Sequence, residues 1–370
     1  MKLLICADSG SLHTFRWATM AHEAGMEVGV FSLNVHSLKE WERYPSIPLY
    51  YPQVQLKQEM IRADTSFSKL KYVLAVKKLR QTIRVFQPDI VHAHYATSYG
   101  LITALTGFRN LAISVWGSDI FDFPRKSFVH AQLMRWILSK AKAIQSTGHI
   151  MAQETQKYTS TPIHVIPFGI NTEVYHPSTA AIDFEKIKTE PVIGTVKSME
   201  KIYGIDVLIR AFQIVQQKIP KAKLIITGAG SQMEDYKKLA EDLNVRELII
   251  FNGKVSPTEV PDILRSLDIF CNLSRRESFG MSILEASACG IPVVATHIDG
   301  VVETAQYDIN AITVDSDDAL SSANAILQII GNPELYQRLK KGGIDLVRRQ
   351  FDKNKITAAL PGFYRQIMAR

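Results

Sequence analysis

Residues 274–296 read SRRESFGMSILEASACGIPVVAT, and this stretch decides the fold class. A short loop leads into Gly280, and an apolar helix is predicted over residues 281–289, because Gly290 and the proline shortly after it are a typical helix stop. Residues 291–295 form a short apolar run, which is typical of a fully buried parallel strand. The stretch therefore predicts an α/β protein built on parallel sheet.

Two acidic residues flank the predicted helix start. The free backbone N–H groups near Gly280, Met281 and Ser282 form an anion site, and the missing side chain of Gly280 lets a phosphate approach. If Glu277 and Glu285 shared one helix, they would lie roughly 12 Å apart, beyond the about 5–9.5 Å of glycosidase pairs. We expect them to bind two parts of one elongated ligand, such as a sugar ring and a ribose. The alternative is a solvated Glu277 and a Glu285 that caps or forms a salt bridge.

This pattern also carries a family resemblance. A Glu, an aromatic–Gly turn, a second Glu eight residues on and then small-Gly-x-Pro-Val-Val-Ala resemble the retaining nucleotide-sugar glycosyltransferases of family 4 (group 1). The resemblance implies the GT-B fold, in which two doubly wound Rossmann-like domains face each other across a cleft. It also implies that Glu277 binds the donor sugar, Glu285 binds the ribose, and Phe279, Gly280, Met281 and Ser282 line the donor site.

The composition favours a two-domain protein, since the chain has 370 residues. Its three cysteines have no metal-type spacing, which favours a reducing compartment. The apolar run at the N-terminus is too short for a signal peptide, and no segment approaches the ~18–20 apolar residues of a membrane span. We expect a cytoplasmic protein, either free or held peripherally at the inner membrane face.

The net charge of +7 lies entirely in the first half of the chain. Residues 1–175 hold 19 Lys and Arg against 12 Asp and Glu, whereas residues 176–370 hold 24 of each. This favours an anionic partner, either a membrane surface or an anionic or lipid-linked acceptor, and no nucleic acid is expected; an arbitrary solvated surface is the alternative. The stretches 69–84 and 125–142 predict basic amphipathic helices. The first predicts either an interfacial membrane helix or a helix that covers the sheet with its basic face outward.

Candidate residues of the first domain follow its predicted strands. Gly10 lies in a glycine loop between a strand and a helix, in the style of a doubly wound sheet, and matches the family's flexible loop. His94 ends a predicted strand and matches a position where the family often carries a His, so it is a catalytic candidate. Trp116 stands where many relatives have the His of His-Gly-x-Asp, and an aromatic ring there can stack on a sugar. Asp119 is either an acceptor-side ligand or a helix N-cap.

The candidate cationic residues lie in the second domain. Lys197 matches the first of two family residues that hold the donor pyrophosphate, and Lys201 stands close to the place of the second. Gly228 begins a Gly-x-Gly turn that lacks the rest of a dinucleotide fingerprint, so the resemblance places it at the donor site instead. Lys254 and Val255 match the segment whose backbone meets the nucleotide base in the family.

The expected organisation has four parts. Residues 1–170 form the acceptor-binding domain, 171–190 a linker, 191–350 the donor domain, and 351–370 a helix that crosses back to the first domain. A further helix is expected to begin at Val301.

The resulting hypothesis is a retaining hexosyltransferase that uses a UDP- or GDP-sugar in cell-surface polysaccharide or glycolipid synthesis. Lys197 and the helix N–H groups would neutralise the leaving diphosphate, so neither metal nor cofactor is expected. Two alternatives stay open. One is a nucleotide-sugar epimerase of the same architecture, and the other is a non-catalytic nucleotide-sugar-binding protein.

Overall fold

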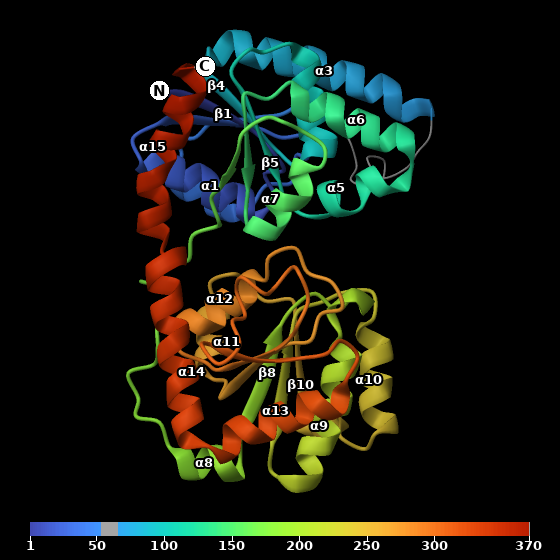
Figure 1. Ribbon diagram of the computed structural model, residues 1–370, viewed down its shortest axis with the longest axis vertical. Coiled ribbons are helices and arrows are strands. Elements are labelled where there is room, and N and C mark those ends of the chain that lie inside the picture. The colour runs from blue at the N-terminus through green and yellow to red at the C-terminus, as the bar shows by residue number, and fades with distance from the viewer. Residues whose placement is uncertain (53–65, 370) are drawn as a thin grey trace. The chain divides into compact units, whose positions relative to one another are not determined.

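A computed structural model describes residues 1–52 and 66–369 of the protein (Figure 1). The chain divides into two units. Residues Met1–Gly169 and Lys353–Arg370 form the first, and Ile170–Asp352 form the second. Each unit is a parallel sheet covered by helices, which agrees with the predicted α/β class.

The first sheet has seven parallel strands in the order β3-β2-β1-β4-β5-β6-β7. Its strands are β1 (Lys2–Cys6), β2 (Glu27–Phe31), β3 (Leu49–Tyr50), β4 (Ile90–His94), β5 (Leu111–Val115), β6 (Ala143–Ser146) and β7 (Ile163–Val165). The helical segments are α1 (Leu12–Glu23), η1 (Lys39–Arg43), α3 (Ser66–Phe86), η2 (Ala96–Gly100), α4 (Leu101–Thr106), α5 (Ser118–Phe121), η3 (Phe123–Lys126), α6 (Phe128–Ser139), α7 (His149–Gln156) and the last helix, α15 (Lys353–Ala369).

The second sheet has six parallel strands in the order β10-β9-β8-β11-β12-β13. Its strands are β8 (Val192–Val196), β9 (Lys223–Thr227), β10 (Ile249–Gly253), β11 (Ile269–Asn272), β12 (Val293–Thr296) and β13 (Ala311–Val314). The helical segments are α8 (Phe184–Thr189), η4 (Lys201–Tyr203), α9 (Ile205–Lys218), α10 (Met233–Asp242), η5 (Arg246–Leu248), α11 (Val260–Arg265), α12 (Met281–Ala288), α13 (Ala319–Gly331), α14 (Pro333–Leu346) and η6 (Val347–Phe351).

The strands β11 and β12 of the second sheet are buried on both faces, which explains why they are largely apolar rather than alternating. Ile269 and Cys271 of β11 point into one core, and Phe270 between them points into the other, because successive side chains of a strand face opposite sides. The apolar run after Gly290 becomes β12, whose four residues are all buried.

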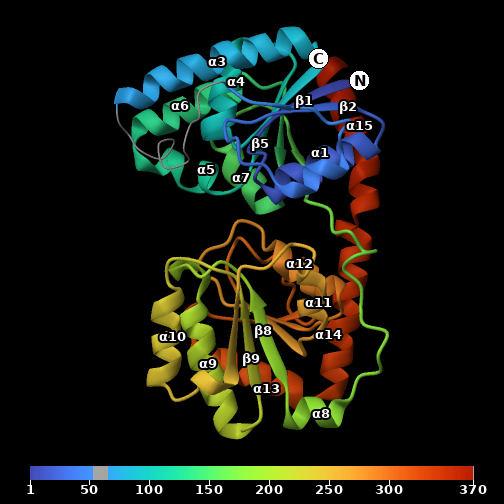
Figure 2. The ribbon, with the colours of Figure 1, turned by 180° about the vertical axis from the view of Figure 1, so that it is seen from behind.

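Helix α15 belongs to the first unit through a buried hydrogen-bond network. The Tyr364 hydroxyl accepts a hydrogen bond from the indole N–H of Trp17 at 2.8 Å and lies 2.8 Å from Nδ1 of His92. Lys353, at the start of α15, forms an ion pair with Glu23 of α1. Both ribbon views place α15 beside α1 (Figures 1 and 2).

Helix α3 covers the first sheet, as one of the two alternatives for residues 69–84 predicts. Val76 and Leu79 are buried in the core, whereas Lys77, Arg80 and Arg84 are exposed. The side chains of residues 66–73 lie outside the described part. Within residues 1–52 and 66–369, no helix combines the length and the apolar character needed to cross a bilayer.

Two expectations about local structure need correction. Residues 171–190, expected as a linker, include helix α8, and its Ile187 is buried in a core of the second unit. The helix expected from Val301 is a single turn, in which the N–H of Ala305 donates to the Val301 carbonyl. The turn stops because the next N–H, of Gln306, donates to the side chain of Asn310 at 2.8 Å instead of continuing a helix.

Candidate active site

The predicted residues of the second unit gather at the carboxyl edge of its sheet. The strand order reverses between neighbours β8 and β11, and ligands of open α/β sheets bind at such a switch point. Lys197 follows β8 directly, and Glu277 lies in the loop after β11. The loops that carry Gly228 and Lys254 follow β9 and β10, so they lie at the same edge.

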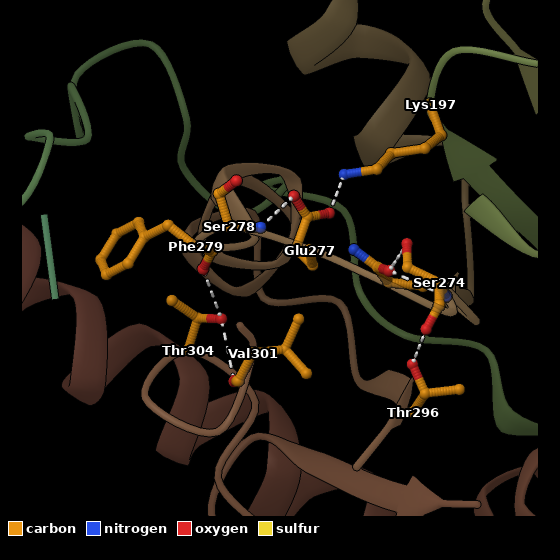
Figure 3. A network of polar contacts seen from close by, with 9 residues as sticks. Lys197, Ser274, Glu277, Ser278, Phe279, Thr296, Val301 and Thr304 are labelled. Atoms are coloured by element: carbon orange, nitrogen blue, oxygen red, sulfur yellow. Dashed lines mark hydrogen bonds and ion pairs between the residues drawn. The ribbon is translucent and has the colours of Figure 1, made fainter. Parts of the chain in front are cut away.

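Lys197 and Glu277 form an ion pair at this switch point (Figure 3). The Lys197 ammonium donates to Oε2 of Glu277, and Oε1 accepts a hydrogen bond from the Ser278 N–H at 3.1 Å. Both charged side chains are largely shielded from water, at 14% and 11% exposed. The Lys197 ammonium also lies 4.8 Å from the centre of the Tyr203 ring, which adds a cation–π attraction. The pair holds each charge in a defined position.

The start of helix α12 lies in the same loop. Its N-cap, Gly280, has φ 77° and ψ 45°, and a Cβ there would lie 2.9 Å from the Thr304 hydroxyl, so only glycine fits without strain. That hydroxyl lies 3.0 Å from the Phe279 carbonyl oxygen and fixes the turn (Figure 3). The first N–H groups of the helix, from Met281 and Ser282, have no carbonyl inside the helix to pair with. The Ser282 hydroxyl is buried, and no hydrogen-bond partner for it occurs among the described residues. These groups lie where the sequence predicts an anion site.

Gly228 packs against the backbone of Lys197. A Cβ at Gly228 would lie 1.9 Å from the Lys197 carbonyl oxygen, and its φ of +141° is strained for any other residue. The glycine therefore lets the loop after β9 pack against the backbone of Lys197.

Arg275 is a residue of the site whose role the sequence did not reveal. Its guanidinium forms a bidentate pair with Asp206, at 2.9 and 2.7 Å, and a further bond of 2.7 Å to Asp317. It also donates to the carbonyl of Lys201 at 2.5 Å and so fixes the η4 turn. Burial opposes ionisation of Asp206, but the hydrogen bonds and the charge of Arg275, together with nearby backbone N–H groups, outweigh it and lower the pKa of that carboxyl. No local pattern could have found this network, since Arg275 and Asp206 are 69 residues apart.

The sequence contains one Asp-x-Asp spacing, at Asp315 and Asp317. The expectation that no metal ion binds did not take this spacing into account. In the structure, Asp317 forms an ion pair with Arg275. Among the described residues, no group of three or more His, Cys, Asp or Glu side chains suits a metal ion.

Other predicted residues of the second unit have mixed placements. Lys201 is exposed in η4 and contributes its carbonyl to Arg275. The Phe279 side chain points away from Glu277 into the core, where its ring centre lies 5.9 Å from that of Phe351, so the ring does not face the Lys197–Glu277 pair (Figure 3). Glu285 is buried on α12. Lys254 and Val255 follow β10, the first exposed and the second half-buried.

The first unit brings Gly10 and His94 to its own switch point, between neighbours β1 and β4. Gly10 follows β1, and His94 ends β4. His94 is 1% exposed, and neither of its ring nitrogens has a hydrogen-bond partner among the described residues. Burial, and then the nearby rings of His92 and His13, hold the pKa of His94 well below its usual value. His94 is therefore a neutral imidazole.

Trp116 lies beside His94, with ring centres 4.9 Å apart. Its indole N–H is buried and also has no partner within the part of the chain that the structure describes. The sequence missed two neighbours of this pair. His13 of α1 stacks on Phe168 at 4.3 Å, and both rings lie within 6 Å of Trp116, at 5.9 and 5.7 Å. The only available signal for His13 was its place three residues after Gly10.

Asp119, for which the sequence left an acceptor-side role and a helix N-cap open, binds backbone N–H groups of its own unit, and the N-cap of α5 is Gly117 instead. Asp119 is fully buried, and its carboxylate accepts backbone N–H groups from Trp116, Gly117 and Ala96, at 3.1, 2.8 and 2.8 Å. Burial raises the pKa of Asp119 although these bonds oppose the shift. Asp119 holds the turn that carries Trp116.

Two family profiles match this chain. The profile of "Glycosyl transferases group 1" matches residues 179–345, and that of "Glycosyl transferase 4-like" matches residues 2–148. N-acetyl-alpha-D-glucosaminyl L-malate synthase of Bacillus anthracis is 22% identical over 86% of this chain and 85% of its own length. A GDP-mannose-dependent phosphatidylinositol monomannoside mannosyltransferase of Mycobacterium tuberculosis is 27% identical over 55% of this chain, and the match spans 56% of that enzyme.

Solved structures share the fold. Anabaena HepE, crystallised with UDP, matches with a TM-score of 0.81 at 19% identity, over 99% of this chain and 100% of that chain. A sucrose-phosphate synthase from Thermosynechococcus elongatus matches with a TM-score of 0.79 at 17% identity, over 100% and 99%. Two doubly wound parallel-sheet units with these neighbours are the GT-B fold. With profile matches over residues 2–148 and 179–345, the chain belongs to the group 1 glycosyltransferases.

Proposed function

We propose that this protein transfers a sugar, with retention of configuration, from a nucleoside diphosphate sugar to an acceptor hydroxyl. One observation carries the proposal. A cation, Lys197, and a hydrogen-bond acceptor, Glu277, meet beside the start of α12 at the switch point of the second sheet. A diphosphate needs the cation and the helix N–H groups, and a sugar ring needs the carboxylate.

The donor would replace the ion pair by two separate contacts. Lys197 would turn to the diphosphate and Glu277 to the sugar hydroxyls, with Glu285 at the ribose and the backbone of Lys254 and Val255 near the base. Complexes of HepE with UDP and with UDP-glucose, and the GDP-mannose dependence in the name of the mycobacterial relative, support a UDP- or GDP-linked donor.

In the proposed reaction the bond between the sugar carbon and the diphosphate oxygen breaks, and its electron pair stays on the diphosphate. The acceptor oxygen attacks from the same face of the sugar, and its proton passes to the leaving diphosphate. Lys197 and the N–H groups of Met281 and Ser282 would stabilise the charge that builds on this oxygen, and preorganised groups of this kind are usually the largest catalytic contribution. We propose that no metal ion is needed.

The first unit would hold the acceptor. The ring nitrogens of His94 and the indole N–H of Trp116 are buried without hydrogen-bond partners among the described residues. Buried polar atoms normally have partners, so these three support a site that takes ligand hydroxyls. The basic first half of the chain supports an anionic or lipid-linked acceptor of polysaccharide or glycolipid synthesis, met in the cytoplasm or at the inner membrane face.

A thermal-shift panel of UDP, GDP, ADP, CMP and NAD tests the donor site. A ligand at ~100 times its dissociation constant should raise the unfolding free energy by about 2.7 kcal/mol. We expect UDP or GDP to stabilise the wild type and not Lys197→Ala. Lys188→Ala, which removes an exposed lysine of α8, is the matched control and should respond like the wild type. Stabilisation by NAD alone would overturn the proposal.

An acceptor screen then separates the alternatives. Transfer of the sugar to an added acceptor supports the transferase. Isomerised donor without transfer would indicate the epimerase, and donor binding without turnover on any acceptor would indicate a binding protein.

A further inference from the structure

Helix α6 of the first unit exposes large apolar side chains to solvent. Phe128, Val129 and Trp136 are 76%, 71% and 38% exposed, while the buried side chains of the same helix join the core of the unit. The two ribbon views show α6 at the periphery of this unit (Figures 1 and 2). Since a folded domain normally covers aromatic residues, their exposure on an ordered helix points to a partner.

The exposed positions share one side of the helix. At 100° per residue, they fall within about 140° of its circumference. We call this surface the α6 face, and its members are Phe128, Val129, Gln132, Arg135, Trp136, Ser139 and Lys140.

The α6 face is surrounded by positive charge. Residues 123–153 contain five Lys and Arg and no Asp or Glu, and Arg125, Lys126, Arg135 and Lys140 are exposed. Two acids flank this segment in sequence. Asp122 is half-buried, and Glu154 is only 8% exposed and pairs with both Arg125 and Lys157. The five cations between these two acids leave the surface with a net positive charge.

Lysines also flank the aromatic rings. The ammonium of Lys140 lies 5.3 Å from the centre of the Trp136 ring, and that of Lys126 lies 6.0 Å from the Phe123 ring. Aromatic rings beside lysines and arginines are typical of helices that lie in the headgroup region of a bilayer, where the ring sits among the lipids and the cation meets a phosphate.

We propose that the α6 face docks on the surface of a membrane that contains anionic lipid. At 1.5 Å per residue, the 12 residues of α6 are about 18 Å long, too short for a hydrocarbon core of about 30 Å, so the helix lies in the plane of the interface. Phe128, Val129 and Trp136 enter the acyl boundary, and the cations bind lipid phosphates. The absence of acidic residues from this segment favours a uniformly anionic surface over a protein partner of mixed charge.

The proposed docking also predicts the chemical class of the acceptor. A transferase held at the bilayer by its first unit meets acceptors that are anchored in lipid and present their hydroxyls at the surface. This last step rests on the proposed function, whereas the docking itself does not.

Sedimentation with vesicles, without any sugar donor, tests the docking. We expect the full chain to bind vesicles of phosphatidylglycerol and phosphatidylcholine in about equal parts, and to bind pure phosphatidylcholine at least ~10-fold more weakly. The double variant Phe128→Ser/Val129→Ser should lose at least ~10-fold in partitioning. Leu320→Ser, which removes an exposed leucine of α13 in the second unit, is the matched control and should bind like the wild type.

Trp136 supplies a second readout, the fluorescence of the wild type itself, for which Trp136→Phe is a conservative control. Brominated lipids quench a tryptophan only when it reaches the acyl region, so vesicles should quench the wild type far more than Trp136→Phe. Equal binding to neutral and anionic vesicles would overturn the proposal. So would full binding by the double variant with a native thermal midpoint. Self-association of the wild type without lipid that the double variant abolishes would also overturn the proposal, because the α6 face would then bind a second copy of the chain. Because no donor is present, failure of the transferase proposal would leave these results unchanged.

Discussion

Lys197 and Glu277 are 80 residues apart in the chain and form an ion pair where β8 and β11 lie side by side. The pair brings together the two charged groups of the proposed donor site, and both side chains are largely shielded from water. A donor that binds as proposed would compete with the ion pair for both charges. This arrangement makes the site a sensitive target for substitution.

Substitution of either partner should abolish most of the transfer. Lys197→Ala and Glu277→Gln should each lower the transfer rate about 10²–10³-fold, as loss of one preorganised catalytic contact does. Each should also destabilise the second unit by about 1–3 kcal/mol, because one charge stays shielded without its partner. Urea unfolding followed by circular dichroism should show that the double variant loses less than the sum of the single losses. Full transfer by Glu277→Gln would contradict the proposed role.

Arg275→Lys should weaken donor binding although the charge is kept. A lysine cannot form the bidentate pair with Asp206 and also reach Asp317 and the Lys201 carbonyl, so the η4 turn loosens. We expect the KM for the donor to rise roughly 10-fold with a smaller change in kcat. Arg338→Lys, at an exposed pair with Asp308 in the same unit, is the control and should change stability by less than about 0.5 kcal/mol. An unchanged KM would show that the turn does not depend on Arg275.

Gly228→Ala should damage the cation side of the site. The new Cβ would lie 1.9 Å from the Lys197 carbonyl, so either the loop or Lys197 has to move, at a cost of at least ~2 kcal/mol. Gly253→Ala is the matched comparison, because Gly253 also has a positive φ, +69°, but has nothing within 4 Å of a new Cβ. Gly253→Ala should lower the free energy of unfolding by about 1 kcal/mol. Equal losses in a thermal melt would mean that steric contact with Lys197 is unimportant.

The stability of the first unit should fall in mild acid because of His92. Burial lowers the pKa of His92 to about 3, whereas an unfolded histidine titrates near 6.5. Between these values the unfolded chain binds a proton that the folded chain does not. The stabilisation is therefore complete above about pH 6.5 and falls by about 1.4 kcal/mol per pH unit below it.

Tryptophan fluorescence can follow this loss selectively, since all four tryptophans of the chain lie in the first unit. Urea titrations at about pH 7.5 and pH 5.5 should show that His92→Gln loses about 1.4 kcal/mol less than the wild type over this interval. The same loss in both proteins would show that His92 is protonated in the folded unit.

Removal of divalent metal should leave transfer intact. Lys197 and the N–H groups at the start of α12 are proposed to neutralise the diphosphate, so EDTA should change the initial rate by less than about two-fold. Loss of activity in EDTA that Mg²⁺ restores would contradict this charge balance and would direct attention to Asp315 and Asp317.

The sequence predicted the elements around the site well because their signals are local. The apolar run and the glycine stop placed α12 and β12 to within about one or two residues. The helix expected at Val301 failed because a side chain nine residues on, Asn310, captures the N–H group that would have continued it. Periodicity carries no information on such a capture.

The sequence by itself determined the α/β class and the position of helix α12 behind Gly280, and it singled out Lys197 and Glu277 as candidates, since each depends on residues within one turn or strand. Only the tertiary structure decided that these two side chains pair, that Arg275 holds the η4 turn, and that Phe279 and Asp119 face inward. Such contacts depend on which strands become neighbours in a parallel sheet. Parallel neighbours are joined by long crossovers, so their partners lie far away in the chain.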